Sequence, residues 1–149
     1  MAAPGSESRA FPRLDPARVA ALETPDLRSA GFSERKAAYL ADLAGHFVSG
    51  RLDPGDWKRL DDETLIAALV DVRGIGRWTA EMFLMFHELR PDVLPVDDLG
   101  LRKAAALHYR GGDAMTPDEL RELGERWRPW RSAATWYLWR SLDPIAIEY

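Results

Sequence analysis

The sequence LVDVRGIGRWTAEMFLMFHELRPDVLPVDDLGLRK, residues 69–103, decides the fold of this chain. In its first half, Gly74 and Gly76 flank a single isoleucine, and apolar residues at helical spacing stand on both sides of them. This pattern predicts two helices joined by a sharp turn, with Ile75 pointing inward to anchor it. In the second half, Pro95 ends an extended connector, and the pair Asp97–Asp98 precedes another helix.

Helical periodicity continues through the rest of the chain, and no segment alternates as a half-buried strand would. Ser33 and Thr116 are predicted helix caps, and Glu119 stands at the spacing of a capping box. We expect helices over residues 16–22, 34–48, 62–73, 77–89, 99–109 and 117–128, and a final helix after Pro129 that runs to about residue 140. The predicted fold is an all-α orthogonal bundle of short helices.

The composition limits the class of protein. A chain of 149 residues with 46% hydrophobic and 30% charged residues fits one globular domain. No apolar run approaches the ~20 residues of a membrane span, so we expect no membrane association. The first dozen residues lack the features of a secretory signal, which predicts a cytoplasmic protein. The absence of cysteine excludes disulfides, cysteine-bound zinc, iron–sulfur clusters and a thiol nucleophile.

The charge pattern leaves room for a local nucleic-acid site. The net charge of −4 argues against binding nucleic acid by bulk electrostatics. Near the C-terminus, however, arginines alternate with Trp127, Trp130, Trp136 and Trp139. Aromatic residues at helical spacing favour core packing over nucleic-acid contact, and both alternatives stay open. Whether Arg102, Arg128 and Arg131 contact phosphate or only solvate a helix face is also open.

The glycine turn has the pattern of a phosphate site. Backbone N–H groups at a turn and at the start of the following helix form an anion site together with the helix dipole. Gly74 and Gly76 have no side chains to keep a phosphate away, and Arg73 and Arg77 flank them. The alternative is a plain glycine turn between antiparallel helices. The lengths of the two helices and the presence of Arg77 favour a helix–hairpin–helix, which grips a DNA backbone phosphate without reading sequence.

The two aspartates suggest chemistry. One of them is predicted to cap the next helix, and Asp98 is the cap or a secondary candidate for the chemistry. A carboxylate at a helix start is favoured in its ionised form. It can therefore stabilise a sugar with oxocarbenium character and orient a water that attacks it.

Four blocks in order give the chain a specific resemblance. They are GFSERKAAYLADLA at 31–44, GIGRWTA at 74–80, LPVDDLGLRK at 94–103 and ERWRPWRSAATWYLW at 125–139. Together they resemble the helix–hairpin–helix DNA glycosylase superfamily, and within it the 3-methyladenine-DNA glycosylase II group. The resemblance implies base excision repair of double-stranded DNA and localisation to the nucleoid.

The resemblance also implies roles for residues. Asp97 is the catalytic aspartate; Trp78, Met82 and Trp139 bind the damaged base. The amides around Gly74 and Gly76 bind phosphate, and the family's hairpins commonly hold a metal cation through backbone carbonyls rather than side chains. No cofactor is expected. Relatives that also cut the backbone carry a lysine at the position of Trp78, so the resemblance implies a monofunctional enzyme that uses water.

Alkylated purines such as 3-methyladenine and 7-methylguanine suit such a pocket. They carry a positive charge, and a cation over an aromatic face gains about 0.5–2 kcal/mol. The implied mechanism flips the damaged nucleotide out of the duplex, which costs a few kcal/mol, and breaks the glycosidic bond beside Asp97. Met82 stands where the best-known member of the group has tyrosine, which leaves the preferred base open.

The resemblance predicts a partial domain. We expect residues 1–10 to be a disordered tail and residues 11–149 to be a glycosylase domain that lacks the N-terminal helices of the family. The surface left by those helices would favour self-association or a partner. The alternative function is therefore a non-catalytic DNA-damage binder, or a partner-dependent interaction module derived from such a glycosylase.

Overall fold

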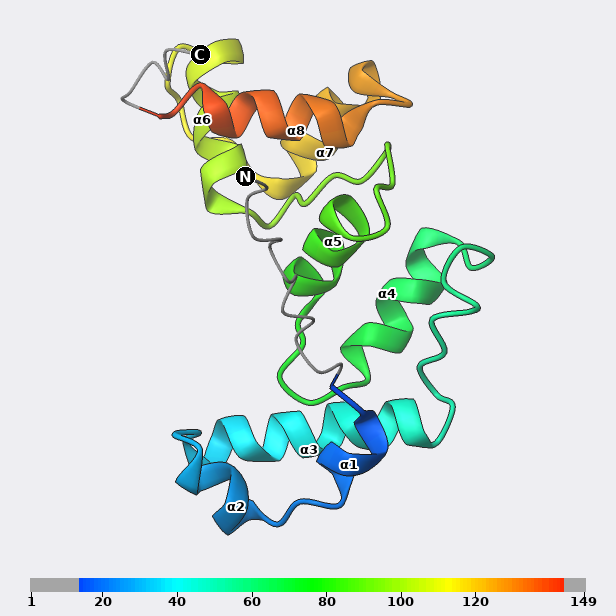
Figure 1. Cartoon of the computed structure of the whole chain (residues 1–149). Helices are drawn as coiled ribbons and strands as arrows, with labels where there is room; N and C mark the ends of the chain where they lie inside the picture. The colour runs from blue at the N-terminus through cyan, green and yellow to red at the C-terminus, as the bar shows by residue number, and fades with distance from the viewer. Residues whose placement is uncertain (1–13, 144–149) are drawn as a thin grey trace, which may run out of the picture. The chain divides into compact units, whose positions relative to one another are not determined.

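The computed structural model describes residues 14–143, and every regular element in that range is helical (Figure 1). The elements are α1 (Pro16–Ala20), α2 (Thr24–Ser29), α3 (Glu34–Val48), α4 (Asp62–Val70), α5 (Arg77–Phe86), α6 (Leu99–Tyr109), α7 (Pro117–Gly124), the 3-10 turn η1 (Glu125–Trp127) and α8 (Arg131–Arg140). The predicted all-α class is confirmed. The predicted tail over residues 1–10 lies outside the described residues. Within them, no helix is long and apolar enough to cross a bilayer.

Local capping explains where most helices begin. The Ser33 hydroxyl accepts from the Lys36 amide, and Asp61 accepts from the amide three residues later. Thr116 and Glu119 form the predicted reciprocal capping box at the start of α7. These predicted helix starts are therefore confirmed.

Several helix boundaries differ from the prediction: α1 ends at Ala20, α4 at Val70 and α7 at Gly124, each earlier than predicted. α2 was not predicted: it begins with a capping box between Glu23 and Asp26 and has proline in its first turn. α5 ends at Phe86, before the predicted residue 89, because Leu89 takes the left-handed conformation with φ 56° and turns the chain away from the helix.

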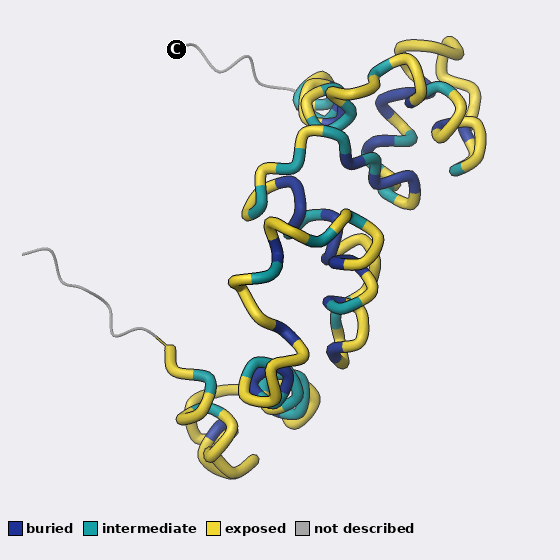
Figure 2. Tube along the Cα trace, turned by 90° about the vertical axis from the view of Figure 1, so that its right-hand side faces the viewer, coloured by how far each residue is buried: buried dark blue, intermediate teal, exposed yellow. Residues whose placement is uncertain are grey.

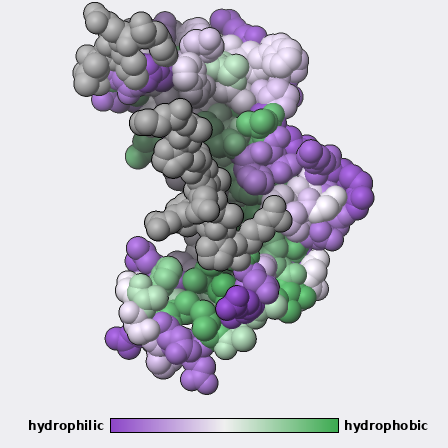
Figure 3. Space-filling view, viewed as in Figure 1, coloured by the Kyte–Doolittle hydropathy of each residue, from purple (hydrophilic) through white to green (hydrophobic). Residues whose placement is uncertain are grey.

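The chain forms two compact units that divide after Leu52. In the first unit, α1 and α2 pack on α3, and Leu27, Ala37 and Ala44 are buried. In the view of Figure 3, hydrophobic side chains gather over this unit. The hairpin and the aspartates both lie in the second unit.

The second unit contains a core built around α6. In it α4 packs on α5, and α6 packs on α7 and α8. Small residues of α6, Ala104 to Ala106, are buried together with Leu101, Leu120 and Leu138. Buried positions recur within elements whose other positions are exposed, as amphipathic helices require (Figure 2). The start of α6, which carries the two aspartates, therefore leads directly into a packed core.

The expected core packing of the C-terminal tryptophans is half right. Trp127 and Trp139 pack against the core around α6. Trp130 and Trp136 are exposed, which corrects the prediction for these two. The reason is the register of α8, whose buried face carries Thr135 and Leu138 and turns its neighbour Trp136 outward.

Candidate functional site

The turn between α4 and α5 has the geometry of an anion site. Gly74 has φ 89°, a backbone conformation that residues other than glycine rarely adopt. The Ile75 amide donates to the carbonyl of Val72 at 3.1 Å, and Ile75 is half-buried as an anchor. Gly76 caps α5 without a side-chain hydrogen bond, and the space where its Cβ would lie is open for 4 Å. The first amides of α5 are therefore left for an external acceptor.

Arg77 is held by carboxylates. Its guanidinium donates to both oxygens of Glu63 at 2.5 and 2.9 Å and to Glu81 at 3.0 Å, which ties α4 to α5. The hydrogen bonds and charge of Arg77 lower the pKa of Glu63 against the opposing effect of burial. Arg73 is exposed at the turn. Phosphate binding by Arg73 and Arg77 stays a prediction. The charge of Arg77 is already compensated by the two glutamates.

Two tryptophans from different helices meet at the start of α6. The indole Nε1 of Trp78 on α5 donates to Asp98 Oδ2 at 2.8 Å, and that of Trp139 on α8 donates to Asp98 Oδ1 at 2.9 Å. Asp98 also caps α6 through the Leu101 amide at 2.5 Å, which confirms the predicted cap. The structure thus brings together two residues predicted to bind the base, through an aspartate whose contact with them the sequence did not indicate.

Smaller features complete this cluster. Met82 is half-buried one turn beyond Trp78. Phe86 stacks on Trp139, with 6.3 Å between the ring centroids and 19° between the planes. Gly100 leaves room for the carboxylate and the indole, since a Cβ there would lie 3.2 Å from Asp98 Oδ1 and 3.6 Å from Trp139 Cδ1.

Asp97 opens onto a neighbouring cavity. Its exposed side chain lines a cavity of about 680 Å³ together with Glu81, Arg77 and the connector. Glu81 is only 4% exposed. Burial raises the pKa of its carboxyl and the charge of Asp97 adds to that, while Arg77 opposes both. The three residues predicted to bind the base are not part of this lining. The catalytic role of Asp97 therefore stays a prediction, with its carboxylate accessible.

The connector before Asp97 is fastened to α8. Asp92 accepts from Arg131 at 2.6 Å and from Arg128 at 2.9 Å. The Ser132 hydroxyl donates to the carbonyl of Arg90 at 2.6 Å and accepts from the Val93 amide at 3.0 Å. Arg128 and Arg131 thus bind the carboxylate of Asp92. The sequence had left open only phosphate contact or solvation of a helix face for these two arginines. No local pattern could have revealed these partners, because they lie on distant parts of the chain.

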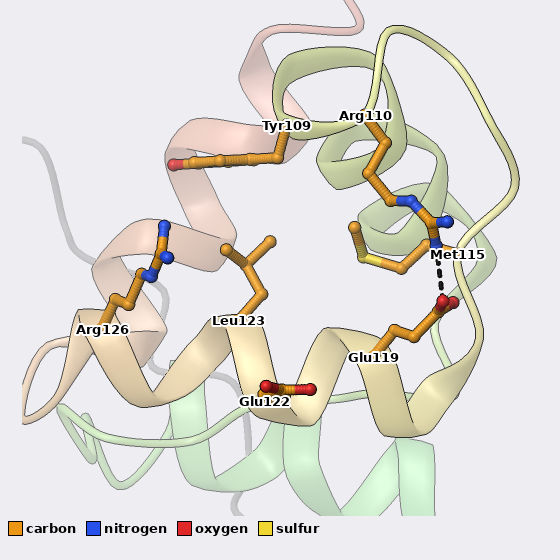
Figure 4. Close-up of a pocket in the computed structure, with 7 residues that line it drawn as sticks. All are labelled: Tyr109, Arg110, Met115, Glu119, Glu122, Leu123 and Arg126. Carbon is orange, nitrogen blue, oxygen red and sulfur yellow. Dashed lines mark ion pairs between the residues drawn. The ribbon is translucent and has the colours of Figure 1, made fainter.

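A further cavity, of about 410 Å³, lies between the end of α6 and α7 (Figure 4). Tyr109 and Leu123 border it, and Arg110 pairs with Glu119 across one side at 2.7 Å. It contains none of the predicted site residues. Within the described residues, no cluster of histidine and carboxylate side chains could hold a metal ion.

Comparisons with known proteins identify the family. The model of the HhH-GPD superfamily base excision DNA repair proteins matches residues 7–129. DNA-3-methyladenine glycosylase 2 of Escherichia coli is 34% identical over 127 residues, which cover 83% of this chain and 41% of that protein. The crystal structure of DNA-3-methyladenine glycosidase from Bacillus halodurans aligns with a TM-score of 0.81 and 38% identity, over 91% of this chain and 62% of that one.

A second solved structure is similar as well. The 3-methyladenine DNA glycosylase Mag1 of Schizosaccharomyces pombe, in complex with abasic DNA, aligns with a TM-score of 0.73 and 36% identity, over 85% of this chain and 62% of that one. The chain spans about half the length of the curated relatives it matches. The resemblance read from the four sequence blocks is confirmed, and the chain belongs to the HhH-GPD superfamily of base excision DNA repair proteins.

Proposed function

We propose that this chain removes alkylated purines from double-stranded DNA by hydrolysing the N-glycosidic bond, without cutting the backbone. One observation carries the proposal: two indoles from different helices converge on the start of α6, next to an exposed aspartate. The relatives of this chain include proteins named DNA-3-methyladenine glycosylases. The solved structure of one such glycosylase is a complex with abasic DNA.

The proposed reaction begins with the grip on DNA. The amides at the start of α5 bind a backbone phosphate, and the damaged nucleotide rotates out of the duplex at a cost of a few kcal/mol. Its base then contacts Trp78 and Trp139, whose ring faces attract a cationic purine. Met82, beside Trp78, adds an adaptable apolar contact.

Bond cleavage then relies on Asp97. The electron pair of the glycosidic bond leaves with the base, so the cationic purine departs as a neutral molecule and the sugar becomes an oxocarbenium ion. The Asp97 carboxylate stabilises that positive charge. Water adds to C1′ and loses its proton to Asp97 or to solvent. Because Trp78 has no amine, no Schiff base forms with the sugar and the backbone stays intact.

The test measures base release and DNA binding in parallel. The chain is incubated with a duplex containing 7-methylguanine, and free base is quantified by chromatography while strand cleavage is followed on a denaturing gel. We expect release by the wild type, a loss of at least a hundredfold in Asp97→Asn, and no strand cleavage. Asp113→Asn, at an exposed aspartate outside the site, is the matched control.

Two results would contradict the proposal. Absence of release by wild-type chain that binds the duplex would refute glycosylase activity. Normal release by Asp97→Asn would refute the role of the aspartate while leaving the activity in place.

A further inference from the structure

Five large apolar side chains are exposed together on one face of the second unit. Four of them border a groove of about 300 Å³ between the end of α5 and the start of α8, and the fifth lies against one of these four. They are between 42% and 76% exposed, and we call them the apolar patch: Phe86, Leu89, Trp130, Trp136 and Tyr137. A contiguous exposed patch of this kind marks an interaction site in many soluble proteins.

Neighbouring groups hold several rings of the patch in place. Trp136 packs edge-on against Tyr137, with 5.2 Å between the ring centroids, and the guanidinium of Arg140 lies 5.7 Å from the centroid of the Trp136 ring. Phe86 stacks on Trp139. Side chains that are already ordered lose less conformational entropy when a partner covers them. The patch is therefore prepared for a binding partner.

The arginines at the edge of the patch are electrically compensated. Arg90 lines the groove, pairs with Asp62 at 3.2 Å and donates to two backbone carbonyls. Arg140 pairs with Asp143 at 2.8 Å. A polyanion such as DNA is bound through uncompensated cations, whereas a surface that meets its own copy must avoid facing like charges. The charge pattern therefore favours a second copy of this chain over a nucleic acid.

The area of the patch suits the centre of a dimer interface. An aromatic side chain offers about 150–250 Å² of surface, so the exposed fractions of the five residues give roughly 500 Å². A stable interface buries about 800 Å² on each partner, with a centre rich in tryptophan, tyrosine and phenylalanine and a polar rim. The patch can supply that centre, and the polar side chains around it can supply the rim.

We propose that the apolar patch is the interface of a homodimer, in which two copies meet about a two-fold axis and side chains at the rim of each groove fill the groove of the other copy. Such an isologous contact pairs the patch with itself, so one set of residues supplies both halves. The dimer goes beyond the proposed function and does not depend on it, because the groove shares no lining residue with the cavity at Asp97.

Two substitutions remove apolar groups of the patch without harming the fold. Leu89 has φ 56°, a conformation that asparagine adopts more readily than leucine, so Leu89→Asn suits the local backbone. Trp130 is the N-cap residue of α8 and makes no side-chain cap bond, and serine is a good cap, so Trp130→Ser can cap the helix. Leu107→Gln is the matched control, because Leu107 is an exposed leucine of α6 outside the patch.

The first measurement is sedimentation velocity of the full chain over a range of protein concentrations. An interface of this size should give a monomer–dimer equilibrium with a Kd in the micromolar range. We expect Leu89→Asn and Trp130→Ser each to weaken dimerisation about tenfold or more, and Leu107→Gln to leave it unchanged. Urea unfolding at a concentration where the wild type is monomeric should show that both patch variants are at least as stable as the wild type.

The second measurement locates the interface by cross-linking. The chain has no cysteine, so a single introduced cysteine reports on one position. A short bismaleimide should join two chains of Ala133→Cys, whose residue lines the groove, and should not join two chains of Leu107→Cys. A chain that sediments as a monomer at every concentration would refute the homodimer and leave the patch to a different partner. Dimers that both patch variants form as tightly as the wild type, or that cross-link only through Leu107→Cys, would place the interface on another face and also overturn the proposal.

Discussion

Replacing Asp92 by asparagine should destabilise the second unit by about 2–3 kcal/mol. Asp92 bonds Arg131 at 2.6 and 3.0 Å and Arg128 at 2.9 Å. The Arg131 and Asp92 side chains are 14% and 23% exposed. Removing one partner of a fully buried ion pair costs about 3–5 kcal/mol because a charge is left unpaired. Partial exposure reduces that cost, and Arg131 keeps its bond to the Asp92 carbonyl at 2.9 Å.

The assay is a double-mutant cycle in urea. Wild type, Asp92→Asn, Arg131→Met and the double variant are unfolded, and the coupling free energy is expected at about 1.5–3 kcal/mol. The exposed pair Asp118–Arg121 is the control, with an expected coupling of about 0.5 kcal/mol or less. A coupling for Asp92 and Arg131 as small as that of the control would refute the reasoning.

The pH dependence gives an independent check on the same pair. Burial alone would raise the pKa of Asp92, but the hydrogen bonds and charges of Arg131 and Arg128 hold it below its ordinary 3.8. A carboxyl whose pKa is lower in the folded state stabilises the fold above its unfolded pKa and loses that effect as pH falls through the folded one. The deficit of Asp92→Asn should therefore be complete near neutral pH and shrink below about pH 4.

Three further predictions concern the site. Gly76→Asp should keep or slightly raise the stability of the fold, because a Cβ at this position meets open space and aspartate is a good helix cap. The same variant should weaken DNA binding at least tenfold in fluorescence anisotropy. Gly76→Ser is the neutral control. Burial raises the pKa of Glu81 above its ordinary 4.5, so its contribution to stability is lost as pH rises through the folded value. Urea unfolding at several pH values should show that the free energy of unfolding falls with rising pH in the wild type and not in Glu81→Gln. Identical pH profiles of the two proteins would contradict this role of Glu81. Gly100→Ala should crowd the contact between Asp98 and Trp139 and shift the Trp139 indole resonance, with little change in the free energy of unfolding.

Helix starts were predictable where the capping partner lies three residues away. Ser33, Asp61 and Thr116 all accept from such a near neighbour, so the local sequence contains both halves of the interaction. The N-cap of α2 is Glu23, and glutamate is not among the residues that usually mark a cap, which explains why the helix was missed. The end of α5 depends on the left-handed Leu89, a conformation that its residue type does not suggest.

The sequence predicted a set of candidate site residues but not the contacts between them. The blocks of the family predicted that Trp78 and Trp139 line one pocket, and the structure brings both indoles to Asp98. The comparisons confirm the family. Which aspartate bonds the indoles, and that Arg77 bonds Glu63, depends on how α4, α5, α6 and α8 meet in space. Sequence spacing describes neighbours along one helix, whereas these contacts join different helices.

The distribution of charge explains how an acidic chain can suit a polyanion. Arg77, Arg128 and Arg131 bond carboxylates of the same chain, so they fix α5 and the connector instead of forming a basic surface. Under the proposed function, the phosphate is then bound by backbone dipoles, which add no net charge. The exposed carboxylate of Asp97 stays available for the positive charge of an alkylated base and of the oxocarbenium ion that follows its loss. A basic residue in place of Asp97 would attract DNA more strongly but would repel both of those cations, so an acidic residue suits this position even in a protein that binds a polyanion.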